Sequence, residues 1–103
     1  MDTMLNDPRG TTITLTDACW HLHILKRHPI MQGLLHETEV TITAPDFIFA
    51  SKIDPNVHLY YKQFTHEQWG QYYLMVVIDI STLLVKTAFP VYNLNKGKAQ
   101  LWP

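Results

Sequence analysis

The chain has 103 residues, of which 47% are hydrophobic and 17% charged, values typical of one globular domain with a substantial core. Its formal net charge of -1 excludes a general attraction to nucleic acid, so an anionic ligand must be held by a local group of cations. The single cysteine, Cys19, excludes an internal disulfide. The longest apolar run, residues 72–78, is too short to span a bilayer, and the N-terminus lacks a secretory pattern, so we expect a cytoplasmic protein without a membrane partner.

The N-terminal residues divide into a lead and the start of the domain. Residues 1–10 are rich in turn formers and predict a flexible lead, leaving 11–103 as a single domain. Residues 11–16 alternate polar and apolar side chains, which predicts a short strand.

The next segment, residues 17–28, predicts a helix that carries three histidines and an arginine. Thr16 is a good N-cap, and Pro29 disfavours helical geometry at the residue before it. Helical spacing places Trp20, His23, Ile24 and Arg27 on one side. Two polar groups one turn apart beside a tryptophan suggest a cleft, although the simpler explanation of the pattern is that His23 caps a core contact and Arg27 covers Trp20.

The remainder of the chain changes from helical to strand-like periodicity. An apolar stripe predicts a second helix from Pro29 to about residue 43. Strands are predicted at residues 47–52, at 57–64 as its antiparallel partner, at 72–80 as a central strand buried on both faces, and at 84–89, ended by Pro90. A hairpin turn at 95–98 leaves 100–102 as a final edge segment. This order predicts an α+β fold in which two N-terminal helices pack on a four-stranded antiparallel sheet.

Several of these segments together resemble a known family. The pattern consists of Trp20, His23-Ile24, Arg27-His28-Pro29, residues 44–48, residues 59–62, Val76-Val77 and Lys86-Thr87-Ala88-Phe89. It is similar to the signature of phage-associated domains in the barnase, EndoU, colicin and RelE-like ribonuclease superfamily, and it covers residues 13–102. The chain departs from the family at Ile30, where an acidic residue is frequent, and at Phe89, where a tyrosine is frequent.

The resemblance implies a metal-independent endoribonuclease, without a cofactor, whose substrate is RNA. It points to His23, Arg27, His28 and Thr87 as the catalytic set. Such cleavage turns the 2'-hydroxyl into the nucleophile, and imidazole and guanidinium groups suit its proton transfers and phosphate contacts. We therefore assign His23 as general base, Arg27 as phosphate clamp, His28 as acid or phosphate contact and Thr87 as a positioning group.

Three further residues are candidates for substrate binding, namely Tyr60, Lys62 and Lys86. A tyrosine stripe in a strand also suits a core, and His28 is equally suited to bonding the last carbonyls of the helix. A metal site is not expected, because His21 and His23 point to opposite sides of a helix.

Two functional hypotheses result from these observations. The first is a toxin of a toxin-antitoxin pair or a phage effector, with an antitoxin protein or a second copy of the chain as candidate partner. The second is a non-catalytic protein- or RNA-binding domain that keeps the fold; the near-neutral charge and Phe89 favour this second hypothesis.

Overall fold

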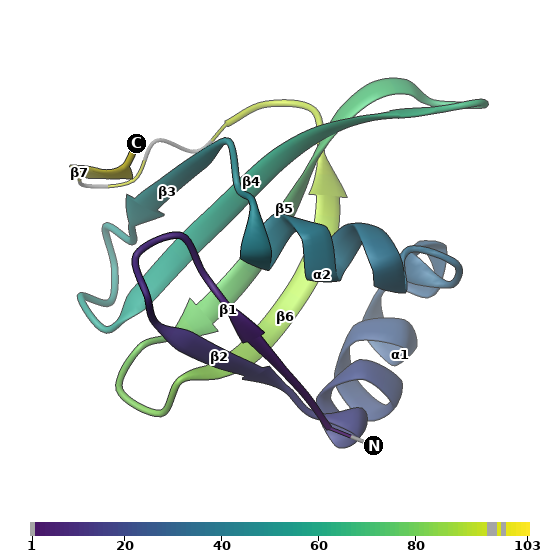
Figure 1. Cartoon of the computed structure of the whole chain (residues 1–103). Coiled ribbons are helices and arrows are strands. Elements are labelled where there is room, and N and C mark those ends of the chain that lie inside the picture. Colours follow the sequence, from purple (N-terminus) through teal and green to yellow (C-terminus); the bar gives the residue numbers. More distant parts are fainter. Residues whose placement is uncertain (1, 95–96, 98) are drawn as a thin grey trace.

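A computed structural model of the chain describes residues 2–94, 97 and 99–103, and Figure 1 shows its course. The elements in chain order are β1 (Thr3–Asn6), β2 (Thr12–Leu15), the π-helical segment η1 (Cys19–Ile24), α1 (Leu25–Arg27), the 3₁₀ segment η2 (Pro29–Met31), α2 (Leu35–Thr43), β3 (Phe47–Ala50), β4 (Val57–His66), β5 (Gly70–Asp79), β6 (Leu84–Val91) and β7 (Ala99–Trp102).

All strands of the described residues belong to one curled sheet of seven strands, in the order β1-β2-β6-β5-β4-β3-β7. Every neighbouring pair is antiparallel except β2 and β6, which run parallel and meet where Thr14 pairs with Leu84. The expected fold of two N-terminal helices on a four-stranded antiparallel sheet is therefore wrong. The molecule is mostly a mixed sheet, and its helical segments are short.

The additional strands lie at the two ends of the chain. Strand β1, inside the predicted flexible lead, pairs with β2 from Thr3↔Leu15 to Asn6↔Thr12. A four-residue strand carries too little alternation to stand out in sequence, and this one is specified by its pairing with β2. Strand β7 forms the far edge of the sheet beside β3, as predicted for residues 100–102. Of the predicted turn at 95–98, only Gly97 lies within the described residues.

The structure agrees with the first predicted helix more closely than with the second. Residues 17–27 are helical, which confirms the first helix. The second helix does not run from Pro29, because a 3₁₀ turn ends at Met31 and Gly33 then adopts φ +88°. That left-handed conformation is open to glycine and interrupts a helix, so α2 begins only at Leu35.

The central strands agree closely with the sequence prediction. Strand β4 pairs antiparallel with both β3 and β5, and β5 contributes side chains to core clusters on both sides of the sheet. Strand β6 continues past Pro90 to Val91. Pro90 is tolerated because, in the described chain, β2 reaches β6 only at Leu84 and leaves the rest of that outer edge without a strand neighbour.

The core has two parts, one on each face of the sheet. The larger cluster joins Trp20 and Ile42 of the helical segments to Val76 of β5. Figure 1 shows α2 lying across this face, with the β1–β2 hairpin on the same side. The smaller cluster, on the other face, is rich in aromatic residues and includes Tyr61 and Met75.

Candidate functional site

The helix–β6 pocket is a hollow of about 310 Å³ between the start of the first helix and the start of β6. It is lined by Thr16, Ala18, Cys19, His23, Leu84, Val85 and Lys86. His23 and Lys86, two residues singled out from the sequence, are thus brought together from elements 63 positions apart. The volume lies at the lower end of the range for small-molecule sites, about 300 to 1,000 Å³.

The helical wall of this pocket is fixed by its first turn. The Cys19 backbone N–H donates to Thr16 Oγ1 at 3.0 Å, so Thr16 acts as the N-cap that the sequence predicts. The buried Cys19 thiol donates to the Val85 carbonyl oxygen at 3.1 Å and ties the helix to β6. Burial raises the pKa of this thiol, which makes Cys19 a packing residue and a poor nucleophile.

A π-helical turn sets the direction of the side chains on this helix. The Leu25 backbone N–H donates to the Trp20 carbonyl, five residues back instead of four. Trp20 and Ile24 are consequently both buried, whereas His23 is exposed at the pocket. The sequence prediction assumed 3.6 residues per turn, which places Trp20, His23 and Ile24 on one side of the helix. The wider π-helical turn directs His23 away from the other two.

Lys86 occupies an irregular position in β6. Val77 pairs with Thr87 and Ile78 pairs with Val85, so Lys86 is the extra residue of a bulge. Bulges redirect side chains and bend the strand. Val85 is buried in the core, while Lys86 is exposed at the pocket.

The other predicted catalytic residues do not line this pocket. Arg27 is exposed at the end of α1, one turn after His23. The His28 ring stacks on Phe89 with 4.7 Å between ring centroids and 27° between planes. Thr87 Oγ1 is buried and has no hydrogen-bond partner within the described part of the chain.

Two of the predicted substrate-binding residues lie on β4, which β5 separates from β6. Tyr60 is completely buried in the larger core cluster. The Lys62 ammonium lies 3.5 Å from Asp46 Oδ1. Neither residue lines the helix–β6 pocket, so of the three candidates only Lys86 is brought to His23.

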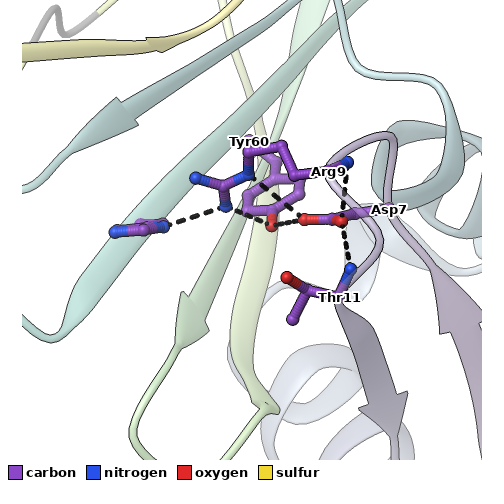
Figure 2. Close-up of polar contacts among 5 residues, drawn as sticks. Asp7, Arg9, Thr11 and Tyr60 are labelled. Atoms are coloured by element: carbon purple, nitrogen blue, oxygen red, sulfur yellow. Dashed lines mark hydrogen bonds and ion pairs between the residues drawn. The ribbon is translucent and has the colours of Figure 1, made fainter.

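A polar group, which we call the Asp7 cluster, consists of Asp7, Arg9, Thr11, His58 and Tyr60, of which Asp7 and Tyr60 are buried. Figure 2 shows the cluster, with Asp7, Arg9, Thr11 and Tyr60 labelled. Asp7 Oδ1 accepts the backbone N–H groups of Arg9 at 3.0 Å and Thr11 at 2.8 Å. Asp7 Oδ2 accepts the Tyr60 hydroxyl at 2.5 Å and Arg9 Nε at 3.4 Å. Arg9 Nη2 donates to the Tyr60 oxygen at 2.9 Å and to His58 Nδ1 at 3.1 Å.

The Asp7 cluster fastens the turn between β1 and β2 to β4, and so closes the curl of the sheet. Burial, together with the smaller effect of the hydrogen bond to Asp7, raises the pKa of the Tyr60 hydroxyl. Burial and the charge of Arg9 lower the pKa of His58. The turn sequence Asn6 to Gly10 was the only signal for this arrangement, and it did not identify β4 as the partner.

A second hollow, the aromatic pocket, has a volume of about 190 Å³. It is lined by Ile30, Trp69, Tyr72, Pro90, Val91 and Tyr92. Trp69 carries the His66 ring stacked on it at 3.8 Å between centroids and meets the Tyr72 ring edge-on at 5.3 Å. Burial and the nearby Glu37 charge raise the pKa of the Tyr72 hydroxyl. Tyr92, which sequence reasoning did not single out, is 67% exposed.

Other kinds of site find no support in the described residues. They contain no group of three or more histidine, cysteine, aspartate or glutamate side chains that could hold a metal ion. No helix among them is long and apolar enough to cross a membrane. No family model, curated protein or solved structure matches the chain.

Proposed function

We propose that this protein is a metal-independent endoribonuclease that cleaves RNA in the helix–β6 pocket. The observation that carries the proposal is that His23 and Lys86, both exposed, line the same open hollow. An imidazole moves protons at neutral pH, and an ammonium neutralises a phosphate, so the pair supplies two of the functions that metal-free cleavage needs.

The proposed reaction begins with His23 taking the proton of the 2'-hydroxyl. The 2' oxygen then attacks phosphorus, the bond from phosphorus to the 5' oxygen breaks, and the 5' oxygen takes a proton from water admitted by the open pocket. The products are a 2',3'-cyclic phosphate and a free 5'-hydroxyl. Lys86 stabilises the charge that grows on the phosphate oxygens, and Arg27, exposed one turn beyond His23, is the second cation.

Two residues of the sequence-based catalytic set have no chemical role in this proposal. The Thr87 hydroxyl oxygen is buried, and the His28 ring is stacked on Phe89. In this scheme His28 supports the end of the helix and Thr87 belongs to the sheet. The cytoplasmic location, an antitoxin partner and a second copy of the chain remain expectations that belong to the same proposal.

The proposal is tested by incubating the purified protein with end-labelled single-stranded RNA in excess EDTA. We expect cleavage products that end in a 2',3'-cyclic phosphate. His23→Ala should reduce the cleavage rate by about 100- to 10,000-fold, the usual contribution of a general base. Lys86→Ala should weaken RNA binding and reduce its dependence on salt, because it removes one phosphate contact.

Matched controls come from the same helix. His21→Ala and Lys26→Ala remove an exposed imidazole and an exposed ammonium that do not line the pocket, and both should keep full activity. Thermal unfolding of each variant separates loss of function from loss of fold. Equal activity of the His23→Ala and His21→Ala proteins would refute the catalytic assignment.

A binding function without turnover is the second candidate. It is favoured by the single imidazole at the pocket, because His28 is held in its ring stack and the described residues that line the pocket include no second histidine and no carboxylate. Under this alternative RNA would bind with the same dependence on Lys86, while no cyclic phosphate would form in EDTA.

A further inference from the structure

The aromatic pocket and the helix–β6 pocket are both lined by residues of β6 and of the helical segments that precede α2. The helix–β6 pocket uses Lys86 on β6, and the aromatic pocket begins at Pro90 on the same strand. The segment after the first helix also contributes, since Ile30 belongs to η2 and η2 contacts β6. Along the chain, His28 falls between His23 and Ile30, and Phe89, on which the His28 ring stacks, falls between Lys86 and Pro90.

The shape and chemistry of the aromatic pocket limit what it can hold. Its volume of about 190 Å³ is several times one water's share of roughly 30 Å³. The volume is also below the roughly 300 Å³ at which sites for complete small ligands begin. Its walls are aromatic and aliphatic, with three aromatic rings among six lining residues. A single planar ring suits these apolar walls, and Tyr92, which is exposed, is the aromatic side chain on which it can stack.

We propose that the aromatic pocket is a base-stacking subsite for the same single-stranded RNA whose phosphate is held at His23 and Lys86. This inference rests on the proposed function, because the RNA is placed by that site. Lys86 and Pro90 are four residues apart on β6, which corresponds to about 13 Å at the rise of a strand. About four stacked nucleotides span that distance, and a splayed strand needs fewer.

Tyr92 is the residue through which the subsite can be tested. Trp69 and Tyr72 pack against each other, so their removal would disturb the fold. Tyr92 is 67% exposed, so its ring can be removed at little cost to stability. Stacking on an aromatic side chain contributes enough to RNA binding that alanine substitution weakens it by about 5- to 150-fold per base.

The experiment measures binding of a 2'-O-methyl hexaadenylate, which cannot be cleaved, to the whole protein. Tyr92→Ala should raise the Kd by about 5- to 150-fold, and Tyr92→Phe should restore it. The slope of log Kd against log salt should stay unchanged, since no phosphate contact is lost. Ile53→Ala, at a 95% exposed residue that lines neither pocket, is the control and should bind as the wild type does.

A series of hexamers with one abasic position identifies the stacked base. One position should make the RNA insensitive to Tyr92→Ala. If RNA binding depends on Tyr92 in this way but no RNA is cleaved, the subsite is supported and only the catalytic proposal is refuted. His23-dependent cleavage with equal Kd values for Tyr92→Ala and wild type would overturn the subsite alone. Failure of the wild type to bind the hexamer would overturn the subsite as well.

Discussion

Replacing Tyr60 by phenylalanine tests whether the Asp7 cluster closes the curled sheet. The change removes one hydroxyl, which donates to Asp7 at 2.5 Å and accepts from Arg9 at 2.9 Å, and it leaves the buried ring in place. Hydrogen bonds to charged partners contribute about 1.5 to 3 kcal/mol each to stability. Asp7 keeps the backbone donors of Arg9 and Thr11, so we expect a net loss of about 2 to 3 kcal/mol.

The loss is measured by urea unfolding and by the midpoint of thermal unfolding. For a domain of this size it corresponds to a decrease in Tm on the order of 10 °C. Tyr92→Phe, at an exposed tyrosine, is the matched control and should change stability by less than about 0.5 kcal/mol. Asp7→Ala should cost more than Tyr60→Phe, because it leaves two donors, the Tyr60 hydroxyl and the Thr11 N–H, without their acceptor, at about 1 to 3 kcal/mol each.

The two substitutions should not be additive, because they remove the same interaction. The double variant should lose clearly less stability than the sum of the two single losses. If Tyr60→Phe costs no more than the Tyr92→Phe control, the reasoning that the cluster holds the hairpin to β4 is refuted.

Three further predictions concern other parts of the molecule. Folding lowers the pKa of His58 below its ordinary value of 6.5, so the free energy of unfolding should be highest above that pH and should decrease as the pH falls below it. Urea unfolding between pH 7.5 and 5.5 should show a smaller decrease for His58→Gln than for the wild type. The buried Cys19 thiol, with its raised pKa, should react with a thiol reagent far more slowly in the native protein than in urea. Gly97→Ala should lower Tm more than Gly33→Ala, because a Cβ at Gly97 would collide with the Ala50 carbonyl oxygen, whereas a Cβ at Gly33 would meet no atom within 4 Å, although both glycines have positive φ.

Each of these predictions has an outcome that would contradict it. An identical pH dependence in wild type and His58→Gln would show that protonation of this ring is not linked to folding. Rapid labelling of the native thiol would mean that Cys19 is not packed against Val85. Equal Tm values for the two glycine variants would count against the close approach of Gly97 to β3.

The elements with strong local signals could be predicted from the sequence. Thr16 and Pro29 bracket the first helix, and the uninterrupted apolar run of β5 identifies the central strand. The elements that decide the architecture have no such signal. Strand β1 is four residues long, and its hairpin reaches β4 through the contact of Asp7 with Tyr60, 53 residues away. Side-chain patterns report periodicity within a segment, and they do not report which distant segment it meets.

The candidate site was predictable to the same limited extent. His23 and Lys86 could be named from residue type and resemblance, and the pocket that unites them depends on the packing of the helix against β6. Arg27, His28 and Thr87 belong to the same motifs, yet they lie outside that pocket. The helical periodicity misplaced His23 relative to Trp20, because a π-helical turn has no signature in the sequence.

The π-helical turn also makes the direction of His23 sensitive to chain length. The Leu25 N–H bonds the carbonyl five residues back, whereas an α-helix would bond the carbonyl four residues back, so the segment Cys19–Ile24 holds one extra residue. Deleting one residue there would let the segment relax into regular α-helix and rotate its N-terminal part relative to its C-terminal part by about 100°. Among homologous chains, the presence of that single extra residue would therefore mark those able to present an imidazole to β6.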